Sequence, residues 1–227
     1  MQNSEDDPSF SGELGKYAAE TYKLSRLTKI VINHGMYKRF EKEKPLLFNV
    51  GIDYASFYYG GKKNNTMLFP LRYSKSKGAE YMLDAATNLH EKLPGWRFVA
   101  FGDFKGKVPK FIDFHYRVDT KKLKELYNGS KIFMLPSLVE GFSLPVLEAM
   151  ASGCAVISTN CGGIDEYMVN NKNGLIVPIK NSRALEEAAL KLVNNEELLK
   201  TLADNGQITA KKYSYENMYG QFINLFK

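Results

Sequence analysis

The stretch Leu135-Pro-Ser-Leu-Val-Glu-Gly-Phe-Ser-Leu-Pro-Val-Leu-Glu-Ala-Met150 decides the interpretation of this chain. It begins at the end of an apolar, strand-like run, Ile132–Leu135, and passes through a glycine-containing loop. A helix is predicted over Phe142–Ala151, with Ser143 as its N-cap and Pro145 in the first turn, where a missing N–H costs nothing. A strand, a glycine loop and a helix N-terminus in this order predict a site for phosphate or another anion.

Two glutamates bracket the predicted anion site. Glu140 lies in the loop and Glu148 lies about one turn into the helix, with seven residues between them. Because carboxylates repel phosphate, they are better suited to accept hydrogen bonds from hydroxyls on either side of it, such as those of a ribose and a hexose. The spacing is therefore compatible with a nucleotide sugar, although a surface glutamate and a glutamate near a helix end would give the same pattern.

The composition is that of an ordinary soluble globular protein. The chain has 227 residues, 44% hydrophobic and 25% charged, which suits one large domain or one domain with a remnant of another. The net charge of +6 suits an anionic ligand or an anionic membrane surface, and a solvated basic face is the commoner explanation. No cluster of arginines and lysines interleaved with aromatic residues indicates nucleic acid.

Several classes of protein are disfavoured. The two cysteines are expected to be reduced thiols, and the three histidines are too far apart for a zinc site. The acidic, polar start is unlike a signal peptide, and no apolar run reaches the length of a membrane span. We therefore expect a cytoplasmic protein, whose basic segment 38–44 could contact the inner face of a membrane.

Strand-like and helical stretches alternate from Thr66 onward. Apolar strands are predicted over 67–71, 96–101, 132–135, 154–158 and 174–178, with a weak strand near 111–116, and helices over 182–193, 196–210 and 215–226. This alternation predicts an α/β fold: a doubly wound, Rossmann-like parallel sheet covered on both faces, with a helical C-terminus. Because ligands bind beyond the carboxyl ends of such strands, Gly102, the loop 136–140 and the segment 158–162 should meet at one edge.

Two cations directly follow the first strand of the alternating region. Arg72 and Lys77 would lie at the same edge as Glu140, where two positive charges facing a helix N-terminus can neutralise a diphosphate and stabilise it as a leaving group. Lys75, in the same loop, is the weaker candidate. Solvated loop lysines are the alternative.

These motifs together resemble a known family. They are Arg72, Lys77-Gly78, Gly102-Asp103, the stretch Pro136–Gly153, Gly162-Gly163 with Glu166, and Asn173-Gly174-Leu175. Their types and order are similar to the C-terminal, donor-binding domain of the retaining GT-B glycosyltransferases of family 4, also called glycosyl transferases group 1. The resemblance covers roughly residues 46–200, and the Glu-x7-Glu motif is its most specific part.

The resemblance implies a donor domain that binds a nucleotide-diphosphate sugar for retaining transfer of a hexosyl group. Arg72 and Lys77 would hold the diphosphate and offset the charge that develops as the glycosidic bond breaks. Glu140 would approach the transferred sugar, and Glu148 would bind the ribose hydroxyls. Backbone N–H groups that would contact sugar and phosphate are those of Gly141, Phe142, Ser143 and Leu144, and Gly102 would line the same site. The family implies no metal and no further cofactor.

The chain departs from the family pattern at three places. Leu71 replaces a glycine before Arg72, and Ser143 replaces a glycine in a change that we expect to be mild, because serine supplies the same backbone N–H. The segment Phe114–Val118 differs where the nucleotide base is seated. There His115 or Tyr116 is expected either to stack on the base or to be an ordinary packed aromatic.

The resemblance also predicts the domain organisation. Residues 1–45 would be a remnant of the N-terminal, acceptor-binding domain and a linker, in which His34 is expected to be structural, and residues 46–227 would be the donor domain. The alternative is a non-catalytic nucleotide-sugar-binding module, or a subunit that needs a separate acceptor domain. A sugar phosphorylase, an epimerase and an NAD-dependent enzyme are disfavoured, the last because no Gly-x-Gly-x-x-Gly follows a strand.

Overall fold

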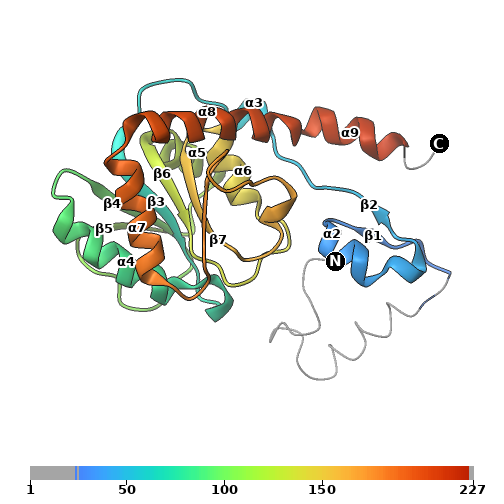
Figure 1. Ribbon diagram of the computed structural model, residues 1–227, viewed down its shortest axis with the longest axis horizontal. Helices are drawn as coiled ribbons and strands as arrows, with labels where there is room; N and C mark the ends of the chain where they lie inside the picture. The colour runs from blue at the N-terminus through green and yellow to red at the C-terminus, as the bar shows by residue number, and fades with distance from the viewer. Residues whose placement is uncertain (1–23, 25, 225–227) are drawn as a thin grey trace.

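Six parallel strands form the central sheet of the protein (Figure 1). The structure is a computed structural model, and it describes residue 24 and residues 26–224. The strands are β3 (Asn64–Leu71), β4 (Arg97–Gly102), β5 (Ile112–Tyr116), β6 (Ser130–Leu135), β7 (Ala155–Thr159) and β8 (Leu175–Val177). Their order across the sheet is β5-β4-β3-β6-β7-β8, and every neighbouring pair is parallel. The chain thus reverses its direction of travel between β3 and β6, as in doubly wound, Rossmann-like sheets. The predicted fold class is confirmed.

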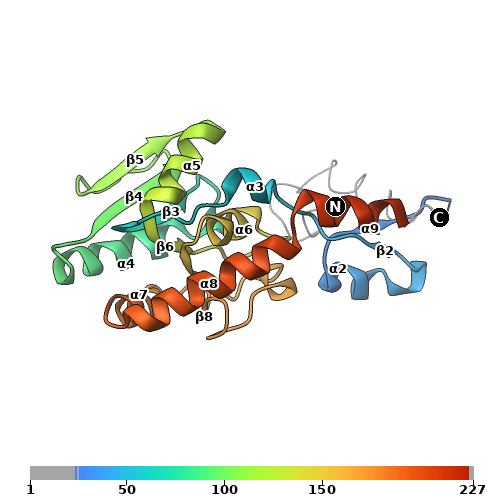
Figure 2. The same cartoon turned by 90° about the horizontal axis from the view of Figure 1, so that it is seen from above.

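Helices cover both faces of this sheet. They are α4 (Ala79–Lys92), α5 (Thr120–Gly129), α6 (Leu144–Ala151), α7 (Ser182–Val193), α8 (Glu196–Lys212) and α9 (Tyr215–Asn224). One core lies between the sheet and α4 with α7, and another lies between the opposite face and α5 with α6. α8 packs against α6 and β7, and α9 continues beyond it past the end of the sheet (Figure 2). The predicted helical C-terminus is confirmed.

The central strand β3 shows why the predicted strands are apolar throughout. Met67 and Phe69 pack on the α4 face and Leu68 packs on the α5 face, and all three are fully buried. Successive side chains of a strand point to opposite faces, so a strand covered on both sides needs a continuous apolar run. The strand continues through Pro70 to Leu71, in register with β4, although proline is rare in a central strand.

A smaller sheet lies beside this domain. Its strands β1 (Ile30–Val31) and β2 (Leu46–Leu47) are parallel and are connected through α2 (His34–Arg39) and the short 3-10 helix η2 (Glu41–Glu43). The two strands lie on either side of residue 45, where the sequence suggests a domain boundary. The division at that residue stays a prediction, and its first part, residues 1–23, lies outside the described residues.

The segment after β2 ties the small sheet to the C-terminal helices. The N–H of Ile52 donates to the carbonyl oxygen of Tyr213 (2.9 Å), and the N–H of Tyr215 donates to the carbonyl oxygen of Ile52 (2.9 Å). A Cβ atom at Gly51 would lie 2.5 Å from Met218 Cγ and 2.6 Å from the Tyr213 oxygen, so only glycine allows this approach. The short helix α3 (Tyr54–Phe57) then leads into β3. Within the described part of the chain, no helix is long and apolar enough to cross a membrane.

Candidate active site

The loops after β3 and β6 meet where the strand order reverses, which is where doubly wound sheets bind their ligands. Gly78 makes this approach feasible. Its backbone is left-handed (φ 65°), and a Cβ atom there would lie 2.1 Å from the carbonyl oxygen of Pro136. The N–H of Leu138 also donates to the carbonyl oxygen of Ser76 (2.7 Å). The expectation that the two loops share one edge is therefore confirmed, and Lys77 and Glu140 are brought together.

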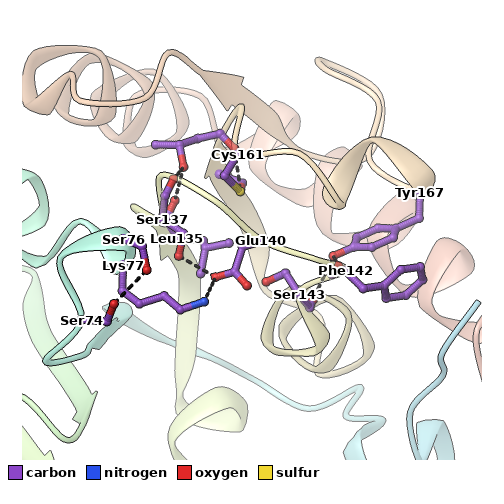
Figure 3. A network of polar contacts seen from close by, with 12 residues as sticks. Ser74, Ser76, Lys77, Leu135, Ser137, Glu140, Phe142, Ser143, Cys161 and Tyr167 are labelled. Atoms are coloured by element: carbon purple, nitrogen blue, oxygen red, sulfur yellow. Dashed lines mark hydrogen bonds and ion pairs between the residues drawn. The ribbon is translucent and has the colours of Figure 1, made fainter. Parts of the chain in front are cut away.

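Glu140 is held in place by two donors (Figure 3). The Lys77 ammonium lies 3.0 Å from Glu140 Oε1, and the hydroxyl of Ser137 donates to the same oxygen at 2.6 Å. The Glu140 side chain is 13% exposed. Its second oxygen, Oε2, has no hydrogen-bond partner among the described residues. The carboxylate is thus fixed through one oxygen and keeps the other available.

Glu148 lies one turn inside α6 in a different environment. The hydroxyl of Tyr127, which is fully buried, donates to Glu148 Oε2 at 3.1 Å. Burial raises the pKa of Glu148, while the Tyr127 hydrogen bond and the charge of Arg72 act to lower that pKa. Arg72 itself is exposed and makes no hydrogen bond or ion pair within the described residues. Its positive charge therefore lies near Glu148 and is available to an anion.

The peptide groups of the loop before α6 are held from behind. The Asn33 side-chain amide donates to the carbonyl oxygen of Gly141 (2.6 Å), and the Tyr167 hydroxyl donates to those of Phe142 (2.8 Å) and Ser143 (2.9 Å). In a trans peptide the carbonyl and the next N–H point in opposite directions. The N–H groups of Phe142, Ser143 and Leu144 are accordingly presented on the other side of the loop, the side away from Asn33 and Tyr167.

The loop after β7 packs against the loop before α6. The N–H of Glu140 donates to the carbonyl oxygen of Cys161 (2.8 Å). A Cβ atom at Gly163 would lie 2.4 Å from the Gly141 carbonyl carbon and 2.6 Å from the Phe142 nitrogen, so the contact requires glycine. Burial, together with the negative charge of Glu140, raises the pKa of Cys161 to about 12.

Ser143 differs from its predicted behaviour. It occupies the N-cap position of α6, but its hydroxyl accepts no hydrogen bond from the helix, so the predicted side-chain cap is wrong. Its backbone is left-handed (φ 61°, ψ 71°), a conformation that costs a residue with a Cβ atom about 1–2 kcal/mol. Serine in place of glycine is therefore not a mild change here, because glycine would adopt this backbone without strain.

Two contributors to the site were not found from the sequence. Asn33 also accepts a hydrogen bond from the N–H of Met36 (2.7 Å), so a local pattern would identify it only as a helix cap. Tyr167 follows the predicted turn at Gly162-Gly163, but nothing in the spacing indicates where its hydroxyl reaches.

His34 connects the N-terminal segment to the same region. Its backbone N–H donates to Glu166 Oε1 (2.5 Å), and its ring nitrogen Nδ1 lies 2.6 Å from Glu166 Oε2. The Glu166 side chain is only 8% exposed. This contact supports the structural role expected for His34, next to the loop that Asn33 holds.

The two aromatic residues expected near the base differ in position. His115 Nε2 lies 3.3 Å from Asp113 Oδ1, and both line a separate cavity of about 240 Å³ with Asn64 and Arg97 at the amino ends of β3 and β4. Tyr116 is exposed at the carboxyl end of β5, with the Arg117 guanidinium 5.3 Å from its ring centre. Tyr116 is therefore the last residue of β5, at the edge that carries the site, whereas the side chain of the preceding His115 lines the other cavity.

No group of three or more histidine, cysteine, aspartate or glutamate side chains placed to hold a metal ion occurs among residues 24 and 26–224. The independence from metal and cofactor stays a prediction.

Comparisons with known proteins agree with this architecture. The family described as glycosyl transferases group 1 matches residues 59–209. The chain is 31% identical over 82% of its length to the N,N'-diacetylbacillosaminyl-diphospho-undecaprenol alpha-1,3-N-acetylgalactosaminyltransferase of Campylobacter jejuni, of which it covers 49%. The chain spans about half the length of the curated relatives it matches.

Two solved structures share the fold. The C-terminal domain of a glycosyl transferase group 1 family protein (LpcC) from Francisella tularensis has 27% identity and a TM-score of 0.65, over 73% of this chain and 100% of that one. The Anabaena protein HepE in complex with UDP-glucose has a TM-score of 0.80 at 16% identity, over 96% of this chain and 69% of that one. The fold is that of a GT-B C-terminal domain. The chain belongs to the glycosyl transferases group 1 family.

Proposed function

We propose that this chain is the donor-binding half of a retaining, family 4-type glycosyltransferase, which transfers a hexosyl group from a nucleoside-diphosphate sugar to an acceptor. The observation that carries the proposal is the meeting of Arg72, Lys77 and the N–H groups of Phe142–Leu144 between two carboxylates in different environments. Cations and peptide N–H groups bind phosphate, whereas Glu140 and Glu148 suit the hydroxyls at its two ends.

In the proposed reaction the bond between the anomeric carbon and the diphosphate oxygen breaks, and its electron pair stays on that oxygen. An acceptor oxygen forms the new bond on the same face of the sugar, and its proton passes to the departing diphosphate oxygen. Arg72 and Lys77 stabilise the charge that develops on the departing diphosphate. Lys77 has three N–H donors, so its contact with Glu140 leaves others for phosphate. No metal ion is needed for this role.

The acceptor site is assigned to a separate domain or subunit. The N-terminal segment contacts the loop before α6, here called the donor loop (residues 140–143), through Asn33, and it contacts Glu166 in the turn after β7 through His34. It is therefore suited to join the donor domain to an acceptor domain. The Campylobacter relative has diphospho-undecaprenol in its name. A lipid-linked acceptor of that kind would fit a cytoplasmic enzyme whose exposed Lys38, Lys42 and Lys44 contact the inner face of an anionic membrane.

Calorimetric titration with UDP, GDP and ADP, and with the matching nucleosides, tests the donor role. Arg72→Ala and Lys77→Ala are each expected to weaken diphosphate binding about tenfold or more and to change nucleoside binding little, because each removes a charge-assisted contact to phosphate. Glu148→Gln should weaken both. Lys110→Ala, an exposed lysine away from the site, is the control. Absence of heat with every nucleotide, or equal losses for nucleoside and diphosphate in the Arg72 and Lys77 variants, would refute the assignment.

A further inference from the structure

Ser143 carries two unfavourable features at once. Its backbone lies in the left-handed region that favours glycine (φ 61°). Its hydroxyl is buried and has no hydrogen-bond partner among the described residues, and the whole residue is only 6% exposed. Strained backbone and unsatisfied buried polar groups are uncommon, and they concentrate where a ligand completes the structure. Serine at this position is therefore hard to explain by the stability of the loop.

The direction of the Ser143 side chain indicates what it would contact. In Figure 3 its hydroxyl points toward the Glu140 carboxylate. The two groups make no hydrogen bond with each other: the Ser143 hydroxyl has no partner, and the Glu140 side-chain contacts with Lys77 and Ser137 both use Oε1. Glu140 Oε2 and Ser143 Oγ thus form a pair of unpartnered oxygens beside the N-terminus of α6.

We infer that Ser143 Oγ and Glu140 Oε2 together bind one hydroxyl of the hexosyl group, which makes Ser143 a specificity-determining residue for the donor. The serine donates to the oxygen of that hydroxyl, and the hydroxyl donates to the carboxylate. A sugar hydroxyl can do both, whereas a phosphate oxygen only accepts and is repelled by Glu140. The inference rests on the proposed donor function and adds a side-chain contact to the role of the loop N–H groups.

The measured quantity is the hexosyl increment, defined as the Kd of a nucleoside diphosphate divided by the Kd of its hexose derivative. It is obtained by calorimetry with UDP and UDP-glucose, GDP and GDP-mannose, and ADP and ADP-glucose. Ser143→Ala keeps the Cβ atom and removes only the oxygen. It is expected to lower the increment about tenfold for the pair that binds best, with little change in the Kd of the nucleoside diphosphate.

Ser143→Gly separates the two features of the residue. It should lower the increment as much as Ser143→Ala does, and it should raise the melting temperature more than Ser143→Ala does, because it removes the backbone strain as well as the unpartnered hydroxyl. Ser152→Ala is the matched control. The Ser152 hydroxyl is buried and donates to the carbonyl oxygen of Phe57 (2.9 Å), away from the site, so its loss should lower stability and leave the increment unchanged.

An unchanged increment in Ser143→Ala overturns the inference while the donor function stands. Equal weakening of nucleoside diphosphate and hexose derivative also overturns it, because the hydroxyl would then act on the loop as a whole. An increment of one in the unmodified protein would mean that the hexosyl group adds no affinity, and it also overturns the inference while the donor function stands. If the unmodified protein binds no nucleoside diphosphate, the proposed function fails, and the inference fails with it.

Discussion

Tyr167 offers the sharpest test of how the donor loop is built. Its hydroxyl lies 2.8 Å from the carbonyl oxygen of Phe142 and 2.9 Å from that of Ser143, and the ring is buried. Burial raises the pKa of Tyr167 well above the ordinary value, so the hydroxyl stays a proton donor throughout the pH range in which the protein is studied. Tyr167→Phe removes this one oxygen and leaves the aromatic contacts with Phe142 (5.3 Å) and Tyr213 (5.6 Å) in place.

The size of the effect follows from the Phe142 carbonyl group, which is left without a donor in a buried loop, whereas the Ser143 carbonyl keeps the N–H of Val146 (3.1 Å). A lost buried hydrogen bond of this kind costs about 2 kcal/mol. In a chain of this length that corresponds to a fall in melting temperature of about 4–8 °C. Affinity for a nucleoside diphosphate should also fall, about tenfold, because the peptide groups that carry the N–H of Ser143 and of Leu144 lose their orientation.

Thermal unfolding and calorimetric titration measure the two effects, and Tyr213→Phe is the matched control. The Tyr213 hydroxyl donates to one carbonyl oxygen, that of Glu166 (2.9 Å), and its residue is only partly buried. The control should lose less stability and keep nucleotide affinity. The reasoning is refuted if the two variants lose equal stability, or if Tyr167→Phe binds nucleotide as tightly as the unmodified protein.

Two further predictions concern titratable groups. In the proposed donor site, ribose hydroxyls would donate to an ionised Glu148, whose pKa is raised by burial. Nucleotide affinity should therefore be full above this pKa and be lost as the pH falls through it, at a higher pH than for an exposed glutamate. Tyr127→Phe removes a hydrogen bond that lowers the same pKa and should move the midpoint of the calorimetric pH profile upward; a midpoint that stays in place argues against the contact. Burial raises the pKa of Cys161 to about 12 and also raises that of Cys154, so both thiols should react with a disulfide reagent only after unfolding, and rapid reaction of the native protein would contradict the structure.

Local sequence patterns were sufficient for the architecture. The directions of successive side chains alternate along a strand and repeat every 3.6 residues along a helix, so the buried positions of each element can be predicted from its own sequence. The apolar run ending at Leu135 and the turn chemistry at Gly141 locate β6, the loop and α6. Because parallel strands all present their carboxyl ends at one edge, Arg72 and Lys77 could be placed at the same edge as Glu140 from the sequence.

The detailed geometry of the site could not be read in this way, because it depends on contacts between residues far apart in the chain. Asn33 is 108 positions from Gly141, and Lys77 is 63 positions from Glu140. Such contacts leave no periodic trace in the sequence. The left-handed backbone of Ser143 is likewise accompanied by packing of the β6 and β7 loops, where Gly163 lies against Gly141.

The sequence by itself therefore determined the parallel α/β sheet, and it placed the glutamates, cations and loop of the proposed site at one edge of that sheet. Tertiary structure alone decided the strand order that places the loops after β3 and β6 side by side, and the pairing of Lys77 with Glu140. It also decided that Asn33 and Tyr167 hold the loop from behind, and that the Ser143 hydroxyl is left without a partner beside Glu140. The physical reason is that hydrophobic periodicity is a local property, whereas hydrogen-bond partners and backbone strain depend on which distant segments are packed together.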